Sequence, residues 1–432
     1  MVALAAHAHR PTVVLLDSYR TALAVEGAGI ALICRAVSCR IPANCRHTHP
    51  NLLPVNKSVI VALAALAYAG PQGTRVAVSL QALHMGMAPA LVGILNALSF
   101  ALPMLISIPA GRIVDRAGVR GPILLCGAMM VSALALAWLA PSVWTLGLAS
   151  SMAGICYVGF TVALNVGVMR IGATKDRVAN FSWLTVGISA GFALGPITAG
   201  FGMDAMGGSG MFVLLAAYPL ALLLLMAWRG RMLPDKVEQA PRSPARLIEV
   251  VSDRKFRPIL LMSFASPSLS DMFNFVVPLM AKAAGLSGSA VGTILGSYAS
   301  ASFAARAILP LVVNRVRHWV VVANLFLVSG IGLILFGLVD EPWAYMALAM
   351  AIGLSHGMGQ PLVMAAFVAN SPPGRQGEIM GAQQMAQGGI SAASPVLIGA
   401  IGTAFGVTPV LLAAGAGLVV ASHLARRMQH GP

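Results

Sequence analysis

The sequence predicts an all-α membrane protein in which twelve transmembrane helices form two pseudo-symmetric six-helix bundles. Of the 432 residues, 58% are hydrophobic and 9% are charged, whereas a soluble domain carries about 25% charged residues. The mean hydropathy is +0.83. No Asp, Glu, Lys or Arg occurs between Gly121 and Met169, and this run is longer than the roughly 20 apolar residues that cross a bilayer as one helix.

Residues 1–57 differ in composition from the rest of the chain, with five arginines, four histidines and three of the five cysteines. Their best apolar run, Thr21–Cys34, is too short to span a bilayer and contains Glu26. We expect a disordered tail, or sequence upstream of the true start with Leu53 or Val55 as the initiator. The cysteine and histidine spacing does not match a metal module, and no signal-peptide cleavage site is apparent.

From Ser58 onward the chain divides at charges, prolines and glycines into twelve apolar segments. Each is predicted to be one helix: 58–83, 89–111, 121–140, 142–169, 178–203, 209–228, 258–281, 287–312, 318–339, 342–369, 377–403 and 406–425. The longest polar gap, 229–257, is the predicted linker between an N-terminal bundle (58–228) and a C-terminal bundle (258–428).

An internal repeat supports this division. A constant shift of 199 residues maps Gly86 onto Gly285 and Pro196 onto Pro395 without a gap. Repeats of this kind are typical of transporters built from two equivalent halves.

The distribution of charge predicts the orientation in the membrane. Loops at 111–120, 170–177, 229–257, 313–317 and 370–376 hold most of the cations. The opposite loops hold Asp204, Asp340, Glu341 and a single cation, Lys282. By the positive-inside rule both termini are cytoplasmic, so the net charge of +15 reflects topology and does not indicate a nucleic-acid partner.

A charged turn with the sequence GRIVDRAGVRG, Gly111–Gly121, separates two of the long apolar runs. It resembles the signature loop between the second and third helices of major facilitator superfamily transporters, although Val119 replaces one basic residue. The resemblance covers residues 58–428 and implies alternating access of a small-molecule substrate to a central cavity, in a bacterial inner membrane. It also implies a cytoplasmic gate at the matching positions: Gly111, Asp115, Arg116, Gly118 and Arg120.

Three ionisable side chains fall deep inside predicted spans, where charge is costly and therefore indicates function. They are Arg75, Asp271 and Arg306. The repeat places Arg75 opposite Asn274, one helical turn from Asp271. We expect Asp271 to be the proton-coupling residue, pairing with Arg75 in one state and with Arg306 in another. The alternatives are a static buried ion pair and an Arg306 that extends to the inner surface.

Polar residues on the predicted helices mark a candidate substrate site. The set is Arg75, Asn165, Asp271, Asn274, His356, Gln360, Gln383 and Gln387. For each one, a helix–helix hydrogen bond is the alternative. His356 has no second ligand at a suitable spacing, so neither a metal site nor a cofactor is expected.

The segment 178–203 carries a glycine stripe: Gly187, Gly191, Gly195, Pro196 and Gly200. Such a stripe allows close helix packing, and it is similar to a motif of drug/proton antiporters in the same superfamily. Those antiporters also carry an arginine four residues before a glycine in the fourth helix, whereas this chain has Ser150 before Gly154.

The expected function is secondary active transport, with proton-coupled efflux of amphipathic or weakly anionic compounds as the first hypothesis. Proton-driven uptake of an organic acid or sugar-like metabolite, with Arg75 binding an anionic group, is the alternative. A transport-inactive membrane sensor is the second alternative. No nucleophile–base pair, phosphate loop or metal cluster predicts an enzyme. The expected partners are the substrate, protons and the lipid bilayer, with the chain as a monomer.

Overall fold

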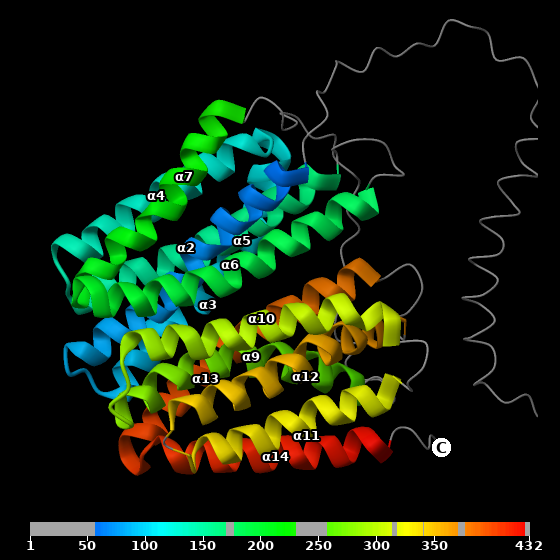
Figure 1. Ribbon diagram of the computed structural model, residues 1–432. Helices are drawn as coiled ribbons and strands as arrows, with labels where there is room; N and C mark the ends of the chain where they lie inside the picture. The colour runs from blue at the N-terminus through cyan, green and yellow to red at the C-terminus, as the bar shows by residue number, and fades with distance from the viewer. Residues whose placement is uncertain are drawn as a thin grey trace, which may run out of the picture. The chain divides into compact units, whose positions relative to one another are not determined.

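The computed structural model describes residues 57–169, 177–229, 257–312, 318–339, 341–369 and 376–427. In these ranges the regular structure consists of twelve α-helices and one short 3-10 turn, η2 (Gly208–Gly210), and each predicted segment coincides with one helix (Figure 1). The helices are α2 (Lys57–His84), α3 (Pro89–Ala117), α4 (Arg120–Leu139), α5 (Val143–Met169), α6 (Arg177–Met206), α7 (Met211–Arg229), α9 (Arg257–Ala283), α10 (Gly288–Val312), α11 (His318–Phe336), α12 (Pro342–Ala369), α13 (Gln376–Phe405) and α14 (Val407–Arg427).

Six stretches of the described chain are long and apolar enough to cross a membrane. They are Pro89–Ile106, Arg120–Leu139, Val143–Val168, Ser182–Met206, Gly208–Trp228 and Ala386–Phe405. Large apolar side chains cover the outside of the helices, including Trp144 (87% exposed) and Leu224 (72% exposed). Exposed Trp144, Trp228 and Trp343 lie near helix ends, which is where tryptophan concentrates at membrane interfaces.

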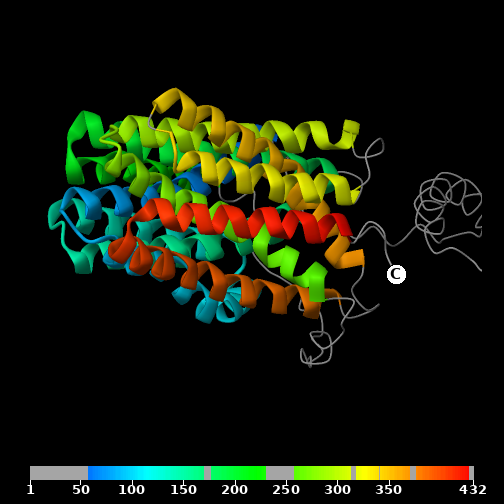
Figure 2. The same cartoon turned by 90° about the horizontal axis from the view of Figure 1, so that it is seen from below.

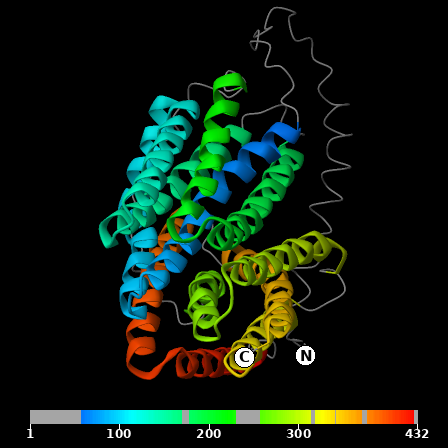
Figure 3. The same cartoon turned by 60° about the vertical axis from the view of Figure 1, so that its left-hand side comes forward.

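The helices pack as two bundles, α2 to α7 and α9 to α14 (Figures 1 and 2). The main contacts between the bundles are α6 with α10 and α3 with α13, and the second pair lies side by side in Figure 3. The 199-residue shift relates α3 to α10 and α6 to α13, so the interface is itself pseudo-symmetric. The predicted fold class is therefore confirmed. The predicted tail and linker lie almost wholly outside the described residues, and their boundaries stay predictions.

Glycines lie where the helices approach most closely. A Cβ atom added to Gly191 would lie 2.8 Å from the Ala65 carbonyl oxygen on α2, and one on Gly195 would lie 2.5 Å from that of Ala69. Gly200 contacts the backbone of α10 in the other bundle at Gly288, and Pro196 lies against the same helix. Any side chain on this stripe would separate the helices, because backbone atoms cannot move out of its way.

The helices α2 and α9 end in equivalent ways. Gly86 follows α2 with φ 78°, and its repeat partner Gly285 follows α9 with φ 67°. Glycine tolerates this left-handed conformation, which commonly ends a helix. We call the end of the bundles that carries Gly86, Asp204 and Gly285 the latch end; the first residue of α2 and the last of α14 lie at the opposite end.

Candidate functional site

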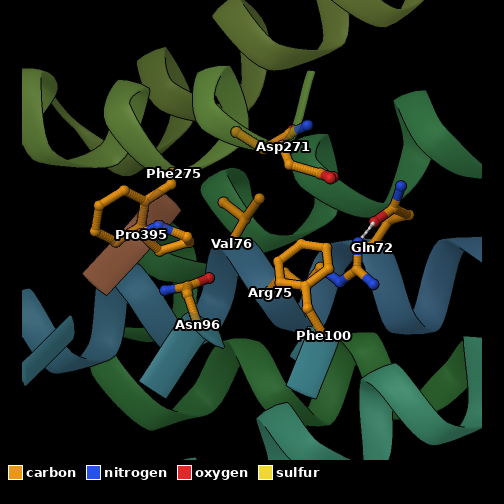
Figure 4. A pocket seen from close by; sticks show the side chains of 9 residues that line it. Gln72, Arg75, Val76, Asn96, Phe100, Asp271, Phe275 and Pro395 are labelled. Atoms are coloured by element: carbon orange, nitrogen blue, oxygen red, sulfur yellow. Dashed lines mark hydrogen bonds between the residues drawn. The ribbon is translucent and has the colours of Figure 1, made fainter. Parts of the chain in front are cut away.

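A cavity lies between the two bundles, lined by residues from both (Figure 4). Its lining residues are Gln72, Arg75, Val76, Asn96, Phe100, Asp271, Asn274, Phe275 and Pro395. The space open to the centre of a water molecule is about 10 Å³, which corresponds to about one water. In this conformation the cavity is therefore too small for an organic substrate, and binding requires the bundles to move apart.

Arg75 of α2 supplies the positive charge of the cavity. Its guanidinium carbon lies 4.5 Å from the ring centre of Phe100 and 5.0 Å from that of Tyr157, and both are within cation–π range. Its Nη1 donates to Gln72 Oε1 at 3.2 Å, the bond drawn in Figure 4. The buried Nε has no hydrogen-bond partner among the described residues. A planar guanidinium with an N–H donor that has no partner in the described part of the chain is suited to binding a carboxylate or a similar anion.

The aromatic wall beside Arg75 is held by its own packing. Tyr157 of α5 meets the ring of Tyr68 edge-on at 5.4 Å and that of Phe192 at 6.4 Å. The Tyr68 hydroxyl donates to Thr161 Oγ1 at 2.9 Å. Three helices of the N-terminal bundle thus fix the ring against which the guanidinium lies.

Asp271 of α9 supplies the negative charge from the opposite bundle. Ser391 Oγ on α13 donates to Asp271 Oδ2 at 2.6 Å. One turn further along α9, Asn274 Nδ2 donates to the Ser270 carbonyl oxygen at 2.8 Å. Within the part of the chain that the structure describes, Arg75 and Asp271 form no ion pair at 4.0 Å or less. The two charges face one cavity and act on each other through it.

Of the predicted site residues, the structure brings Arg75, Asp271 and Asn274 together at the cavity. Gln387 is linked to Asp271 through Ser391. The other described members of the set do not line the cavity: Asn165 on α5, Arg306 on α10, His356 on α12 and Gln383 on α13. The side chain of Gln360 lies outside the described residues.

Two of these outlying residues have other neighbours. His356 is buried, and its Nδ1 lies 2.7 Å from the Tyr298 hydroxyl. Arg306 interacts electrostatically with Tyr298 and Tyr157. Both groups therefore belong to the helix packing around the cavity in this conformation, while their roles in other conformations stay predictions.

Several residues in or beside the cavity were not predicted from the sequence, although weak signals exist. Gln72 lies three residues before Arg75, on the same helical face. Pro395 is the repeat partner of Pro196, and Ser391 lies four residues after Gln387. Phe100 and Asn96 carry no signal of this kind, since their place at the cavity depends on how α3 packs.

Hydrogen bonds join the two bundles at the latch end. Asp204 accepts from the backbone N–H groups of Gly288 at 2.8 Å and Ser289 at 2.7 Å, at the start of α10. Thr403 Oγ1 accepts from the Ala90 N–H at 3.0 Å, at the start of α3. The 199-residue shift maps Asp204 onto Thr403 and Ala90 onto Ser289, so the two latches are repeat equivalents. The two bundles are therefore held together on this side of the cavity.

The predicted gate lies at the opposite end. Gly111, Asp115 and Arg116 are in the last turns of α3, and their side chains lie outside the described residues. Gly118 follows α3 with φ 76°, and Arg120 begins α4. The gate role of these residues stays a prediction.

Two pseudo-symmetric helical bundles around a cavity are typical of membrane transporters. Residues 60–395 match the family model of the Major Facilitator Superfamily, and the chain belongs to that family. It is a multi-pass membrane protein that transports a small-molecule substrate, as the resemblance of the signature loop implied.

Solved structures share the fold at low sequence identity. A POT family transporter in complex with 5-aminolevulinic acid has a TM-score of 0.72 at 12% identity, covering 86% of this chain and 95% of that one. The nucleoside transporter NupG has a TM-score of 0.70 at 13% identity, covering 86% and 99%. A bacterial homologue of the human lysosomal transporter Spinster, inward-facing and occupied, has a TM-score of 0.68 at 16% identity, covering 86% and 96%. No curated protein matches the sequence.

Proposed function

We propose that this transporter moves a small organic anion together with a proton, the anion bound at Arg75 and the proton carried by Asp271. The observation that supports this most directly is that Arg75 and Asp271, from opposite bundles, line one cavity without forming a direct ion pair. The aromatic side chains of Phe100 and Phe275 in the same lining suit the apolar part of an amphipathic substrate.

The direction of coupling follows from the net charge of the four loading states. With Asp271 ionised and no substrate, the charges of Arg75 and Asp271 cancel. With Asp271 protonated and a monovalent anion at Arg75, the charges cancel again. Either ligand alone leaves one uncompensated charge inside the bundle, which costs several kcal/mol. The two neutral states are therefore the ones that change conformation, so one proton and one anion travel in the same direction.

Export by exchange of a proton for the anion is the competing hypothesis, favoured by the antiporter-like glycine stripe. In the structure those glycines pack α6 against α2 and α10, which accounts for them without reference to direction. Ser150, at the place of the antiporter arginine, is buried and donates to the Leu95 carbonyl oxygen. The cavity geometry thus favours symport, and an inward proton gradient makes symport an uptake process.

Proteoliposomes distinguish the two modes by their charge movement. Purified transporter would be reconstituted with a pH-sensitive dye inside, and a panel of carboxylates and sulfonates added outside, with protein-free liposomes correcting for passive entry. Symport of one proton and a monovalent anion is electroneutral, so a potential set with potassium and valinomycin leaves its rate unchanged. Exchange moves two charges, worth about 4.6 kcal/mol per 100 mV, and its rate would depend steeply on potential.

The variants Asp271→Asn and Arg75→Gln are both expected to abolish anion-driven acidification. Glu341→Gln, which removes an exposed carboxylate outside the cavity, is the matched control and should transport normally. Full proton-driven transport by Asp271→Asn would refute the proposal.

We also infer that Arg306 becomes the partner of Asp271 in the other conformation, and that the chain is a monomer in a bacterial inner membrane. The basic loops favour cytoplasmic termini.

A further inference from the structure

A chain of buried polar side chains runs between α9 and α13 from Asp271. Ser391 Oγ donates to Asp271 Oδ2 at 2.6 Å, and Gln387 Nε2 donates to Ser391 Oγ at 3.0 Å. Gln387 Nε2 also donates to Ser268 Oγ on α9 at 3.2 Å. Ser391 is 2% exposed and Gln387 is 8% exposed. The two residues are four apart on α13 and therefore share one helical face.

The direction of these bonds orients the Ser391 hydroxyl. A serine hydroxyl has one proton to donate, and an amide nitrogen can only donate. Because Gln387 Nε2 donates to the Ser391 oxygen, the Ser391 proton must point to another acceptor, and the carboxylate of Asp271 lies within reach. Ionised Asp271 offers this proton a charged acceptor, which makes a stronger hydrogen bond than a neutral one. Protonated Asp271 can still accept this bond, but more weakly, because a neutral carboxyl oxygen is a poorer acceptor than a carboxylate oxygen.

We propose that Ser391, oriented by Gln387, is a positioning residue that stabilises the ionised form of Asp271 and sets the pH at which Asp271 takes up its proton. The inference rests on the proposed function, in which Asp271 carries the transported proton. The positioning of Asp271 by Ser391 would couple proton uptake more tightly to anion binding. In the empty cavity Asp271 stays ionised, and its protonation becomes favourable when an anion neutralises Arg75.

The ionisable groups around Asp271 do not supply the same contact. On the helices packed against α9 and on α5 across the cavity, the described ones are Lys57, Tyr68, Arg75 and His84 of α2, Cys156 and Tyr157 of α5, Tyr298 and Arg306 of α10, Tyr345 and His356 of α12, and His423 and Arg426 of α14. Of these, Arg75 acts on the charge of Asp271, and Ser391 is the side chain that hydrogen-bonds it. The described part of α3 up to Ile106 has no ionisable side chain.

The test is the pH titration of Asp271 in proteoliposomes, followed by the infrared band of its protonated carboxyl and assigned by the loss of that band in Asp271→Asn. A hydrogen bond to a charged group is strong enough that its removal in Ser391→Ala should raise the pH of half-protonation by about one unit. Ser391→Thr keeps the hydroxyl and should restore the wild-type titration. Gln387→Ala should give a smaller shift in the same direction, because the serine proton is then free to turn.

The matched control is Ser394→Ala, which removes a buried hydroxyl from the same helix. Ser394 Oγ has no hydrogen-bond partner among the described residues, so its removal should leave the titration of Asp271 unchanged. An unshifted Ser391→Ala, or an equal shift in Ser394→Ala, would overturn the inference. If Ser391→Ala does not fold, Gln387→Ala and Ser391→Thr decide it. Should the titration shift as expected while Asp271→Asn still couples transport to protons, the positioning role stands and the proposed function fails.

Discussion

The carboxylate of Asp204 makes two hydrogen bonds between the bundles at the latch end, and its removal should open the cavity on that side. Both of its oxygens accept backbone N–H groups of α10, at 2.8 and 2.7 Å. These bonds cross from one bundle to the other, so they exist only while the latch end is closed. Replacing Asp204 with alanine therefore destabilises the closed state and leaves the open state unaffected.

The magnitude follows from the capping geometry. Loss of a side chain that caps a helix N-terminus costs about 0.5–2 kcal/mol. Two charge-assisted bonds place Asp204 in the upper part of that range, while its exposure to water reduces the penalty. A cost of about 1–2 kcal/mol shifts the closed-to-open equilibrium about 5- to 30-fold. The repeat-equivalent Thr403→Ala loses one neutral bond, about 0.5–1.5 kcal/mol, and should shift the equilibrium less.

Cysteine labelling measures this equilibrium without a known substrate. With the native cysteines replaced by serine, Val76→Cys places one thiol in the cavity lining. A membrane-impermeant maleimide is added on the side of the latch end, which the positive-inside rule predicts to be the outer face. The labelling rate should rise about 5- to 30-fold in Asp204→Ala. It should rise further when Thr403→Ala is added, because the two Asp204 bonds and the Thr403 bond all break when this end opens.

The control is Thr293→Ala on α10, whose hydroxyl donates to the Ser289 carbonyl oxygen of its own helix. This variant removes a hydrogen bond from the same helix and leaves the contacts between the bundles in place. Equal labelling rates in Asp204→Ala, Thr293→Ala and the parent protein would show that Asp204 does not hold the latch end closed.

Three further predictions concern other parts of the molecule. In Gly200→Ala the added methyl group would clash with the backbone of α10. The variant should disfavour the closed state by about 1–3 kcal/mol and raise the labelling rate of the Val76→Cys thiol. Gly389→Ala, with open space around it, is the control and should leave that rate unchanged. Tyr298→Phe leaves the His356 ring nitrogen without the bond it makes at 2.7 Å, so the Tm of the purified protein should fall by an amount corresponding to about 1–3 kcal/mol. Asp115→Ala should slow transport while the amount of protein in the membrane, measured by immunoblot, stays normal.

The arrangement of helices was predictable because the bilayer restricts the possibilities. A spanning helix must be apolar over its whole length, so charges, prolines and glycines mark the boundaries almost residue by residue. The repeat then added tertiary information, since it placed Arg75 opposite Asn274 before any contact was known. The shared cavity of Arg75 and Asp271 agrees with that placement.

Contacts that depend on which helix lies beside which could not be predicted. Asp204 was interpreted only as a charge in a loop, because nothing local shows that the N-terminus of α10 would lie within reach of it. His356 carries a polar group inside a span, which suits a cavity as well as a helix contact, and the structure shows its bond to Tyr298. Sequence spacing identifies the polar face of a helix, whereas the partner of that face depends on tertiary packing.

The two charged side chains that join the bundles at the latch end both bind helix ends, and this affects how the transporter changes conformation. Asp204 binds N–H groups at the start of α10, and Lys282 Nζ donates to the Leu83 carbonyl oxygen near the end of α2. Each charge meets the helix end of opposite partial charge. These hydrogen bonds form only while each helix end lies beside its charged partner in the other bundle. A small rotation of the bundles would therefore break all of them at once. Because Thr403 and Ala90 repeat the Asp204 contact across the pseudo-twofold relation, opening one latch opens the other. We therefore expect the latch end to be either fully closed or fully open. Under the proposed function, the net charge of Asp271, Arg75 and the bound anion determines which loading states change conformation.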